Sequence, residues 1–327
     1  MKTAIKGMEF SVPKLILTND DMAKIVETSD EWIRQRTGIG ERHVVSGEED
    51  AVTLANDAVD KLLKSTGIDP ETIDMIISST SAPQRPYPST ACEVQAHIGA
   101  KNASAFDITA ACSGFLYALQ LGRANIESGF AKRILVLASD TTSKFIDWTD
   151  RTSCVLFGDG AAATILEATD DENGDIIHIE LEADGSCKEF ISLRVQSENC
   201  PLAEQSSYDG TYFIKMAGKD VYKFVMKKIP AVIEKTLQNA NMTIDDVDYF
   251  IPHQANMRMI EALTDRIGIA PEKVLSNIEK YGNMSAASIP CVISEKIKSG
   301  ELKTPSTVLL SAFGAGMTSA CAIINLR

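Results

Sequence analysis

Apolar residues recur along the chain at two spacings, and each spacing predicts a different kind of element. Helical spacing runs through residues 51–67 and again through 113–129, where a glycine ends the second segment. Apolar runs over 73–81, 103–109 and 132–140 predict buried strands. Strands that alternate with helices of this length are typical of parallel βαβ units, so we expect an α/β protein.

The chain contains a repeat that becomes visible when the sequence is compared with itself. Residues 59–78, "VDKLLKSTGIDPETIDMIIS", align without a gap with residues 233–252, "IEKTLQNANMTIDDVDYFIP", 174 positions later. The same offset places residues 133–138, "RILVLA", over 307–312, "TVLLSA". One offset that serves two separate segments indicates two copies of one βαβαβ unit. We expect the copies to face each other about a pseudo-twofold axis.

Several residues that could take part in catalysis or binding come directly after predicted strands. Cys112 follows the strand at 103–109, His253 follows "DYFIP", and the glycine turn "FGAG" follows "TVLLSA". Ligands of parallel sheets bind beyond the carboxyl ends of the strands. The repeat therefore predicts that these groups converge where the two copies meet.

The acidic composition narrows the range of partners. The 327 residues suffice for two domains and carry a formal net charge of −13. This charge argues against nucleic acid as a partner, because phosphate binding needs a cationic surface. No apolar run reaches the roughly 18 residues needed to span a bilayer, and no signal-peptide pattern opens the chain, so we expect no membrane association.

The cysteines are scattered and form no CxxC or Cys/His cluster, so we expect neither a disulfide framework nor a bound metal. A reducing cytoplasm is the simplest setting for such a chain. The seven positions are 92, 112, 154, 187, 200, 291 and 321.

Cys112 differs from the other cysteines in its surroundings. It lies among small residues in "DITAACSGF", at the start of the helix predicted over 113–129. A helix N-terminus stabilises a thiolate, so we expect the pKa of this thiol to lie below its usual value of about 8.5. Cys154 in "SCVLF" and Cys321 in "SACAIINL" are expected inside strands, as core residues.

Four segments have both a chemical and a structural interpretation. His253 in "IPHQAN" is either a functional imidazole or a buried, satisfied side chain, and Asn283 in "KYGNMSAAS" is either a donor or a turn residue. "SAFGAGMTSA" (311–320) is either a simple turn or a source of backbone N–H donors. "FGDGAAA" (157–163) suggests a dinucleotide fingerprint, but strand-like residues on both sides favour a hairpin.

Cys112, His253 and Asn283, together with "GDGAAA" and "FGAGMT", resemble the thiolase superfamily, and specifically the β-ketoacyl-acyl-carrier-protein synthase III family. The resemblance extends from "TSDEWIRQRTGIGER" (28–42) to the C-terminus. It implies a five-layered αβαβα fold built from two pseudo-twofold-related βαβαβ halves. The half over 1–170 would carry the nucleophilic cysteine, and the half over 171–327 the histidine and asparagine. The resemblance also implies a cytoplasmic homodimer.

The same resemblance implies a ping-pong condensation that initiates type II fatty-acid synthesis, with no cofactor. Cys112 would take a short acyl group from acyl-CoA, after which malonyl-acyl-carrier protein would lose CO₂ and give 3-ketoacyl-acyl-carrier protein. His253 and Asn283 would donate hydrogen bonds to the enolate oxygen, and the backbone N–H groups of Cys112 and Ala315 would form the oxyanion hole.

Binding residues are assigned by the resemblance as well, in three groups. The conformation of the loop 185–212 and the length and branching of the primer are left open by the sequence. The CoA-binding group is Thr28, Trp32, Arg36, Arg151, Gly218 and Asn256, the carrier-protein docking pair is Lys223 and Arg258, and the acyl pocket has Phe157 and Tyr87, the latter crossing the dimer interface.

Other functions remain as alternatives. A related condensing or acyl-transferring enzyme of secondary metabolism would share the three catalytic residues, although Trp32 with Arg151 favours CoA priming. A degradative thiolase is disfavoured because its second cysteine lies in a CxG context, which is absent around Cys321. The intact Cys, His and Asn set disfavours a non-catalytic scaffold that binds carrier protein, and the hairpin predicted over 157–163 disfavours a nicotinamide oxidoreductase.

Overall fold

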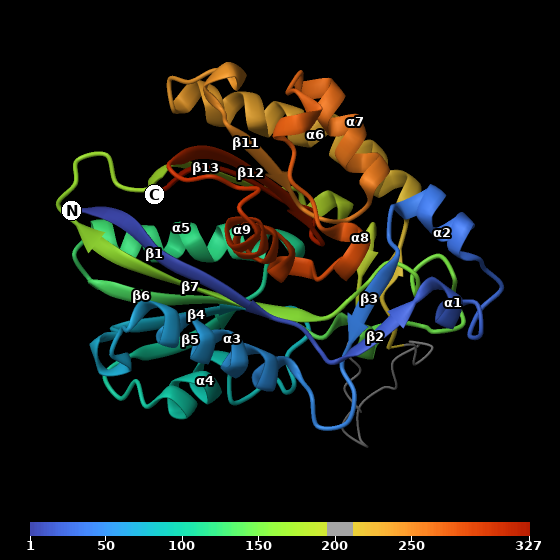
Figure 1. Cartoon of the computed structure of the whole chain (residues 1–327), viewed down its shortest axis with the longest axis horizontal. Coiled ribbons are helices and arrows are strands. Elements are labelled where there is room, and N and C mark those ends of the chain that lie inside the picture. Colours follow the sequence, from blue (N-terminus) through green and yellow to red (C-terminus); the bar gives the residue numbers. More distant parts are fainter. Residues whose placement is uncertain (195–211) are drawn as a thin grey trace, which may run out of the picture.

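The computed structural model describes residues 1–194 and 212–327, which form five alternating layers of helices and sheets (Figure 1). The first sheet has the order β1-β7-β6-β4-β5 and the second β11-β12-β13-β8. Their strands are β1 (Lys2–Ser11), β4 (Met75–Ser79), β5 (Ser104–Ile108), β6 (Arg133–Asp140) and β7 (Gly160–Thr169), then β8 (Ile176–Ala183), β11 (Tyr249–Pro252), β12 (Ser306–Gly314) and β13 (Thr318–Leu326).

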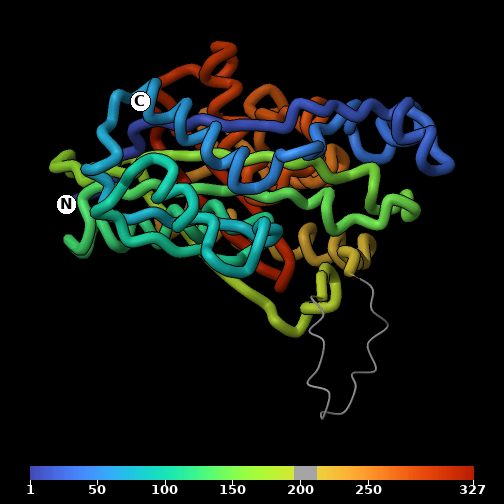
Figure 2. The backbone as a smooth tube through the Cα atoms, turned by 90° about the horizontal axis from the view of Figure 1, so that it is seen from below, coloured from blue at the N-terminus to red at the C-terminus, as the bar shows by residue number. Residues whose placement is uncertain are grey.

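Helices cover the outer face of each sheet and fill the space between the sheets. α3 (Ala51–Thr66) and α4 (Thr90–Ile98) pack on the first sheet, and α6 (Gly218–Asn239) and α7 (Met257–Ile267) cover the second. Figure 2 shows the molecule from below, with α3 and α4 in front of the first sheet. Among the described residues no helix is both long enough and apolar enough to cross a membrane.

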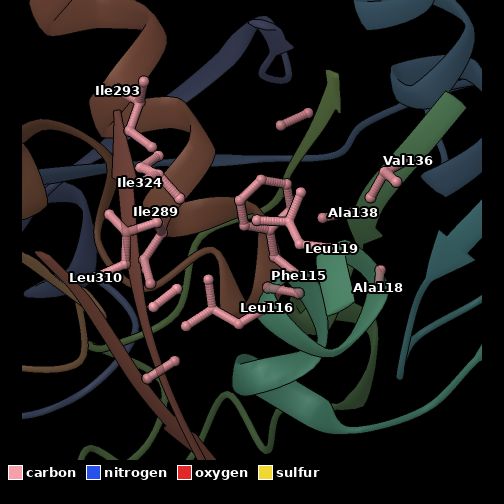
Figure 3. Close-up of a cluster of buried hydrophobic side chains, with 14 of the residues drawn as sticks. Phe115, Leu116, Ala118, Leu119, Val136, Ala138, Ile289, Ile293, Leu310 and Ile324 are labelled. Carbon is pink, nitrogen blue, oxygen red and sulfur yellow. The ribbon is translucent and has the colours of Figure 1, made fainter. Parts of the chain in front are cut away.

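The middle layer consists of α5 (Gly114–Glu127) and α9 (Ser288–Ser299). Figure 3 shows Phe115 and Leu119 of α5 in one apolar cluster with Ile289 and Ile293 of α9. Leu310 of β12 belongs to the same cluster, so this layer joins the two sheets into one core. The alternation of side chains along the strands makes this possible, because each sheet is buried on both faces.

Smaller elements complete the structure. The glycine that follows α3, Gly67, adopts a left-handed conformation and ends that helix where the sequence predicted an end. The remaining strands and helices are β2 (Leu15–Thr18), which pairs with β3 (Glu41–Val44), β9 (Ile191–Ser192), which pairs with β10 (Lys215–Met216), and α1 (Asn19–Met22), α2 (Asp30–Thr37) and α8 (Ile278–Tyr281).

The predicted α/β class and the predicted parallel units are confirmed. β4 pairs in parallel with both β5 and β6, and β11 pairs in parallel with β12. Two features lay outside the prediction: β1 and β7 extend the first sheet by antiparallel pairing, and β13 and β8 extend the second in the same way. Of the loop 185–212, the part over 195–211 lies outside the described residues.

The repeat found in the sequence extends through the structure. β6 and β12 correspond at the offset of 174, and α5 corresponds to α9. Short 3-10 turns precede the two central helices, η2 at Ala111–Ser113 and η7 at Ser285–Ala287, and they also lie 174 residues apart. Ala111 and Ser285 open these turns with positive φ angles of 47° and 51°. The same strained backbone thus occurs once in each half.

Candidate active site

A pocket of about 670 Å³ opens at the carboxyl ends of the parallel strands, where the two halves meet. Both halves contribute to its wall, as the convergence predicted from the repeat requires. Its lining includes Ser81, Ala82, Thr109, Cys112, Phe145, Phe157, Ile191, Ile214, Met216, Gly218, His253, Asn256, Met259, Asn283, Ser285, Phe313, Ala315 and Thr318.

Cys112 occupies the centre of η2, immediately before α5. The end of β12 lies directly against it: a Cβ atom on Gly314 would lie only 2.7 Å from the Cys112 backbone N and 3.0 Å from the Ala110 carbonyl O. Gly314 is therefore required for this close approach. The Ser113 hydroxyl also donates to Thr318 Oγ1 at 2.7 Å, which fixes the cysteine turn to the far half of the chain.

The electrostatic state of Cys112 differs from the expectation. Burial raises the pKa of its thiol to about 12, the nearby Ser285 hydroxyl lowers the pKa in part, and the charge of Asp140 raises it. The predicted depression of this pKa is wrong, because the penalty of burying a thiolate exceeds the stabilisation from the helix end.

His253 follows β11 directly, as predicted, and its backbone N donates to the Ser311 carbonyl O at 2.7 Å. Its ring packs edge-on against Phe313, with 5.3 Å between the ring centroids. Burial lowers the pKa of His253 to about 3, so the imidazole is neutral and can donate one N–H. Within the described chain its buried Nδ1 atom has no hydrogen-bond partner.

Asn283 is held in place by backbone contacts with the segment before β7. Its N–H donates to the Leu156 carbonyl O at 2.9 Å, and its carbonyl O accepts from Gly158 N at 3.0 Å. Its side-chain Oδ1 accepts from Ser285 N at 2.9 Å. Because this contact occupies the amide oxygen, the Nδ2 donor is the part of the amide left for a ligand.

The segment 154–160 is not the predicted hairpin. Residues 151–156 form turns, so Cys154 is buried in the core as expected but lies in no strand, and β7 begins only at Gly160. A side chain on Gly158 would collide with the Tyr281 carbonyl O. The glycines of "FGDG" therefore serve to let the Asn283 segment approach, a packing requirement that a strand pattern does not reveal.

The two proposed oxyanion donors border the same pocket. Cys112 N belongs to η2, and Ala315 is the residue that directly follows β12. The close approach at Gly314 brings these two backbone segments together. Both residues therefore lie where two backbone segments meet on the wall of the pocket, and their role as oxyanion donors stays a prediction.

Trp32 and Arg151, which the resemblance assigns to CoA binding, lie in direct contact, with no gap between them. The Arg151 guanidinium lies over the Trp32 ring, 5.1 Å from the ring centroid, and Arg36 lies 6.0 Å from the same centroid. A flat base between two such groups needs two contacts of about 3.5–4.0 Å each. An adenine would therefore have to displace Arg151, whose Nη1 donates to the Glu27 carbonyl O at 2.9 Å.

The other candidate CoA-binding residues differ in the contacts that they already make within the protein. Gly218 lines the pocket at the start of α6, and no atom of residues 1–194 or 212–327 lies within 4 Å of the position that a Cβ would take. Asn256 also lines the pocket, but its amide caps α7 at Arg258 N and donates to the Arg36 carbonyl O at 3.0 Å. The Thr28 Oγ1 atom is buried and has no partner among the described residues.

The docking and acyl-pocket candidates also occupy defined places. Lys223 and Arg258 are exposed on the neighbouring helices α6 and α7, and Lys223 pairs with Asp220 at 3.4 Å. Phe157 lines the pocket, whereas Tyr87 is 85% exposed and does not line the pocket of its own chain. An exposed Tyr87 is compatible with the predicted position across a dimer interface.

Two polar residues near Cys112 were missed by the sequence analysis. Ser285 lines the pocket, and Asp140 is fully buried at the end of β6 beside it. The repeat offered a signal for Ser285, because it is the counterpart of Ala111 in the cysteine turn. Nothing in the sequence distinguished Asp140 from the chain's other acidic residues.

Comparison with known proteins agrees with this geometry. Residues 106–185 match the family described as 3-oxoacyl-[acyl-carrier-protein (ACP)] synthase III, and residues 237–326 match its C-terminal family. β-Ketoacyl-[acyl-carrier-protein] synthase III of Microcystis aeruginosa is 43% identical over 316 residues, 96% of this chain and 94% of that protein.

Solved structures of similar proteins support the same family. The crystal structure of 3-oxoacyl-[acyl-carrier-protein] synthase III from Aquifex aeolicus superposes with a TM-score of 0.91 at 41% identity, over 99% of this chain and all of that one. The priming β-ketosynthase of the R1128 polyketide biosynthetic pathway gives a TM-score of 0.90 at 30% identity, over 100% of this chain and 96% of that one.

The two facing halves and the cysteine-bearing pocket between them define the class of this protein, an acyl-transferring condensing enzyme with the thiolase fold. Within that class, the chain belongs to the β-ketoacyl-acyl-carrier-protein synthase III family.

Proposed function

We propose that this enzyme initiates type II fatty-acid synthesis by condensing a short acyl-CoA with malonyl-acyl-carrier protein. The observation that carries the proposal is the gathering of Cys112, His253 and Asn283 on the wall of one pocket. In the first half-reaction the Cys112 sulfur attacks the thioester carbonyl, the backbone N–H groups of Cys112 and Ala315 bind the oxyanion, and CoA leaves.

In the second half-reaction His253 and Asn283 act on the malonyl thioester. Loss of CO₂ places negative charge on the thioester oxygen, and two donors aimed at that oxygen stabilise it. Neutral His253 supplies one N–H, and the Asn283 amide, whose Oδ1 is already occupied by Ser285 N, supplies the other. The enolate carbon then attacks the acyl group on Cys112 and forms 3-ketoacyl-acyl-carrier protein. One such donor typically lowers the barrier by about 3 kcal/mol.

The remaining residues bind the carriers. Trp32 and Arg151 would hold the adenine of CoA after Arg151 moves from the ring face, and Gly218 leaves space for the pantetheine arm. Lys223 and Arg258 form a local cationic surface on a chain with a net charge of −13, which favours docking of an acidic carrier protein. A cytoplasmic homodimer, with Tyr87 reaching the partner's acyl pocket, fits the exposure of that side chain.

A priming role in secondary metabolism is the second candidate. The similarity to the priming β-ketosynthase of a polyketide pathway favours it, because the two chains share the fold over their whole lengths. The two functions differ in the acyl donor rather than in the catalytic groups.

Intact-mass spectrometry tests both functions. The protein is incubated separately with acetyl-, propionyl-, isobutyryl-, hexanoyl- and octanoyl-CoA, and adducts are mapped by peptide digestion. We expect a single adduct on Cys112, formed fastest with acetyl- or propionyl-CoA. A preference for longer or branched chains would favour the specialised priming role. If no CoA gives an adduct while Cys112 can still be alkylated, the assignment of CoA as donor is wrong.

A further inference from the structure

The short helix α8 lies just before Asn283, so the contacts that fix this helix also fix the position of the Asn283 amide. α8 spans Ile278–Tyr281, and Gly282 is the one residue between its end and Asn283. A single helical turn is not stable by itself, because few hydrogen bonds offset the cost of ordering it. Contacts with other elements must therefore hold α8 in place.

Glu295 of α9 contacts α8 at both of its ends. The Glu295 Oε2 atom accepts from Asn277 Nδ2 at 2.9 Å, directly before the helix. The Oε1 atom accepts from the Tyr281 hydroxyl at 2.8 Å, on the last residue of the helix, and from Lys280 Nζ at 3.2 Å. One carboxylate thus spans the length of α8 and fixes it to the middle layer of the fold.

The start of α8 has a second support that does not depend on Glu295. Asn277 N donates to Gln254 Oε1 at 3.1 Å, and Gln254 is fully buried. Loss of the Glu295 carboxylate would therefore leave the helix fixed at Asn277. The other end, at Tyr281, would lose the hydrogen bond to its hydroxyl, and this is the end nearer to Asn283.

Close packing would transmit a movement of Tyr281 to Asn283. A Cβ atom on Gly158 would lie only 2.2 Å from the Tyr281 carbonyl O, so the two backbones are in contact. Gly158 N also donates to the Asn283 carbonyl O at 3.0 Å. Between them, a Cβ on Gly282 would lie 2.9 Å from the Leu156 carbonyl O. Because these backbones leave no space, a shift of the helix end must also shift Asn283.

The charge of Glu295 allows it to hold both ends of the helix. Burial alone would raise the pKa of this carboxyl group, but hydrogen bonds from Asn277, Tyr281 and Lys280 hold the pKa below its usual value. An ionised carboxylate has two oxygens, and both accept hydrogen bonds. A glutamine has one accepting oxygen and an NH₂ group that donates, so it could satisfy one end of α8 but not both.

We propose that Glu295 is a positioning residue that acts through α8 on the Asn283 amide, an inference that rests on the proposed function. In that function the Asn283 amide donates to the malonyl thioester oxygen as CO₂ leaves. A displacement of about 1 Å can slow a reaction about 100-fold, because the donor no longer meets the developing charge. Glu295 is not among the described residues that line the pocket, so it would act without touching the substrate.

The first test compares the two half-reactions in the wild type and in Glu295→Gln. Acylation by acetyl-CoA is followed by intact mass, and decarboxylation by CO₂ release from malonyl-acyl-carrier protein. We expect kcat for CO₂ release to fall at least about tenfold while KM changes less than about twofold, because the amide acts in the transition state. Acylation should stay within about twofold of wild type, since it uses Cys112 and Ala315.

Tyr281→Phe gives a milder form of the same test. It removes the hydroxyl that bonds to Glu295 and keeps the buried ring, so it remains informative if Glu295→Gln folds poorly. We expect CO₂ release to fall about threefold or more, again with acylation within about twofold of wild type.

A double variant shows whether the effect passes through Asn283. Adding Glu295→Gln to Asn283→Ala should lower CO₂ release by less than about twofold further, because the donor that Glu295 positions is already absent. A general loss of packing would instead lower release as much in the Asn283→Ala background as in the wild type. Additive losses would therefore contradict the proposal.

Glu301→Gln is the matched control. Glu301 also accepts from a lysine, Lys296 at 2.6 Å, but its exposed carboxylate bonds to Lys296 and Ser299 of α9 rather than to α8. Both half-reactions should stay within about twofold of wild type, because an exposed ion pair contributes little. If Glu295→Gln slows both half-reactions equally, or slows neither, the proposal is wrong. If the wild type itself acquires no acyl group, it is the proposed function that fails.

Discussion

The two halves of the molecule each place a turn of the same backbone conformation at the site, but the side chains on the two turns differ. The 3-10 turns η2 and η7 begin with the same strained φ angle, and each is followed by a central helix. In the first half the middle residue of the turn is Cys112, whereas the equivalent residue of the second half is Ala286. The duplicated fold therefore supplies two equivalent positions, of which one carries a nucleophile.

The difference extends to the strand end that faces each turn. Asp140 ends β6 and accepts the N–H of Ala286, whereas its counterpart Gly314 ends β12 and lies against the N–H of Cys112. One half thus presents a carboxylate to the opposite turn, and the other presents no side chain at all. The Ala286 N–H is bound within the protein, whereas the Cys112 N–H is the group that the proposed mechanism assigns to the substrate oxyanion.

Exchanging the nucleophile between the halves should give the largest effect. Cys112→Ala should abolish the acyl adduct, because no other pocket-lining residue carries a thiol in the described chain. Adding Ala286→Cys to that variant should not restore the adduct, because Ala286 is buried and does not line the pocket. Intact-mass spectrometry with acetyl-CoA measures both. Acylation at position 286 in the double variant would mean that the two turns are chemically equivalent after all.

Removing the donors of the second half should have a smaller, step-specific effect. His253→Ala and Asn283→Ala should still form the acyl-enzyme but decarboxylate malonyl thioester about 10²–10³-fold more slowly, because each loses one donor to the enolate oxygen. Ser79→Ala is the matched control, since Ser79 is the buried counterpart of His253 and does not line the pocket. Release of CO₂ is the readout, and equal losses in all three variants would contradict the assigned roles.

Filling the position opposite Cys112 should have the smallest effect of the three. The added methyl group of Gly314→Ala would lie 2.7 Å from Cys112 N, so the turn must shift. We expect kcat/KM to fall about tenfold and the free energy of unfolding to fall by about 1–3 kcal/mol. A Cβ on Gly185 would meet no described atom within 4 Å, so Gly185→Ala should change the free energy of unfolding by less than about 0.5 kcal/mol. Denaturant unfolding and steady-state kinetics measure both, and a fully active Gly314→Ala would show that the close approach is dispensable.

Most of the architecture could be predicted from the sequence, because the helices and strands follow from the spacing of apolar residues over short stretches of the chain. Apolar spacing located α3, α5 and β6, and a single offset exposed the duplication. Residues at the ends of parallel strands could be assigned to the site from the sequence alone, because ligands of such sheets bind beyond the carboxyl ends of the strands. His253 and the glycine turn after β12 are examples.

What the sequence could not supply depends on contacts between distant segments. The thiol pKa of Cys112 follows from how deeply the pocket is buried, and the helix end alone suggested the opposite direction. The apolar run around Cys154 looks like a strand, but the Asn283 segment packs against it and turns it into a loop. The place of Asp140 beside the cysteine turn also depends on such contacts, because its carboxylate accepts from Ser81 N and from Ala286 N.

The contact between Ser113 and Thr318 joins residues that are 205 positions apart. During synthesis, the residues of the cysteine turn leave the ribosome before β12 and β13 have been made. Until then the turn lacks its contact with Thr318. Gly314, Ala315 and Thr318 follow the cysteine turn in the chain by about 200 residues. An unfinished or C-terminally truncated chain would therefore carry Cys112 without a formed reaction centre.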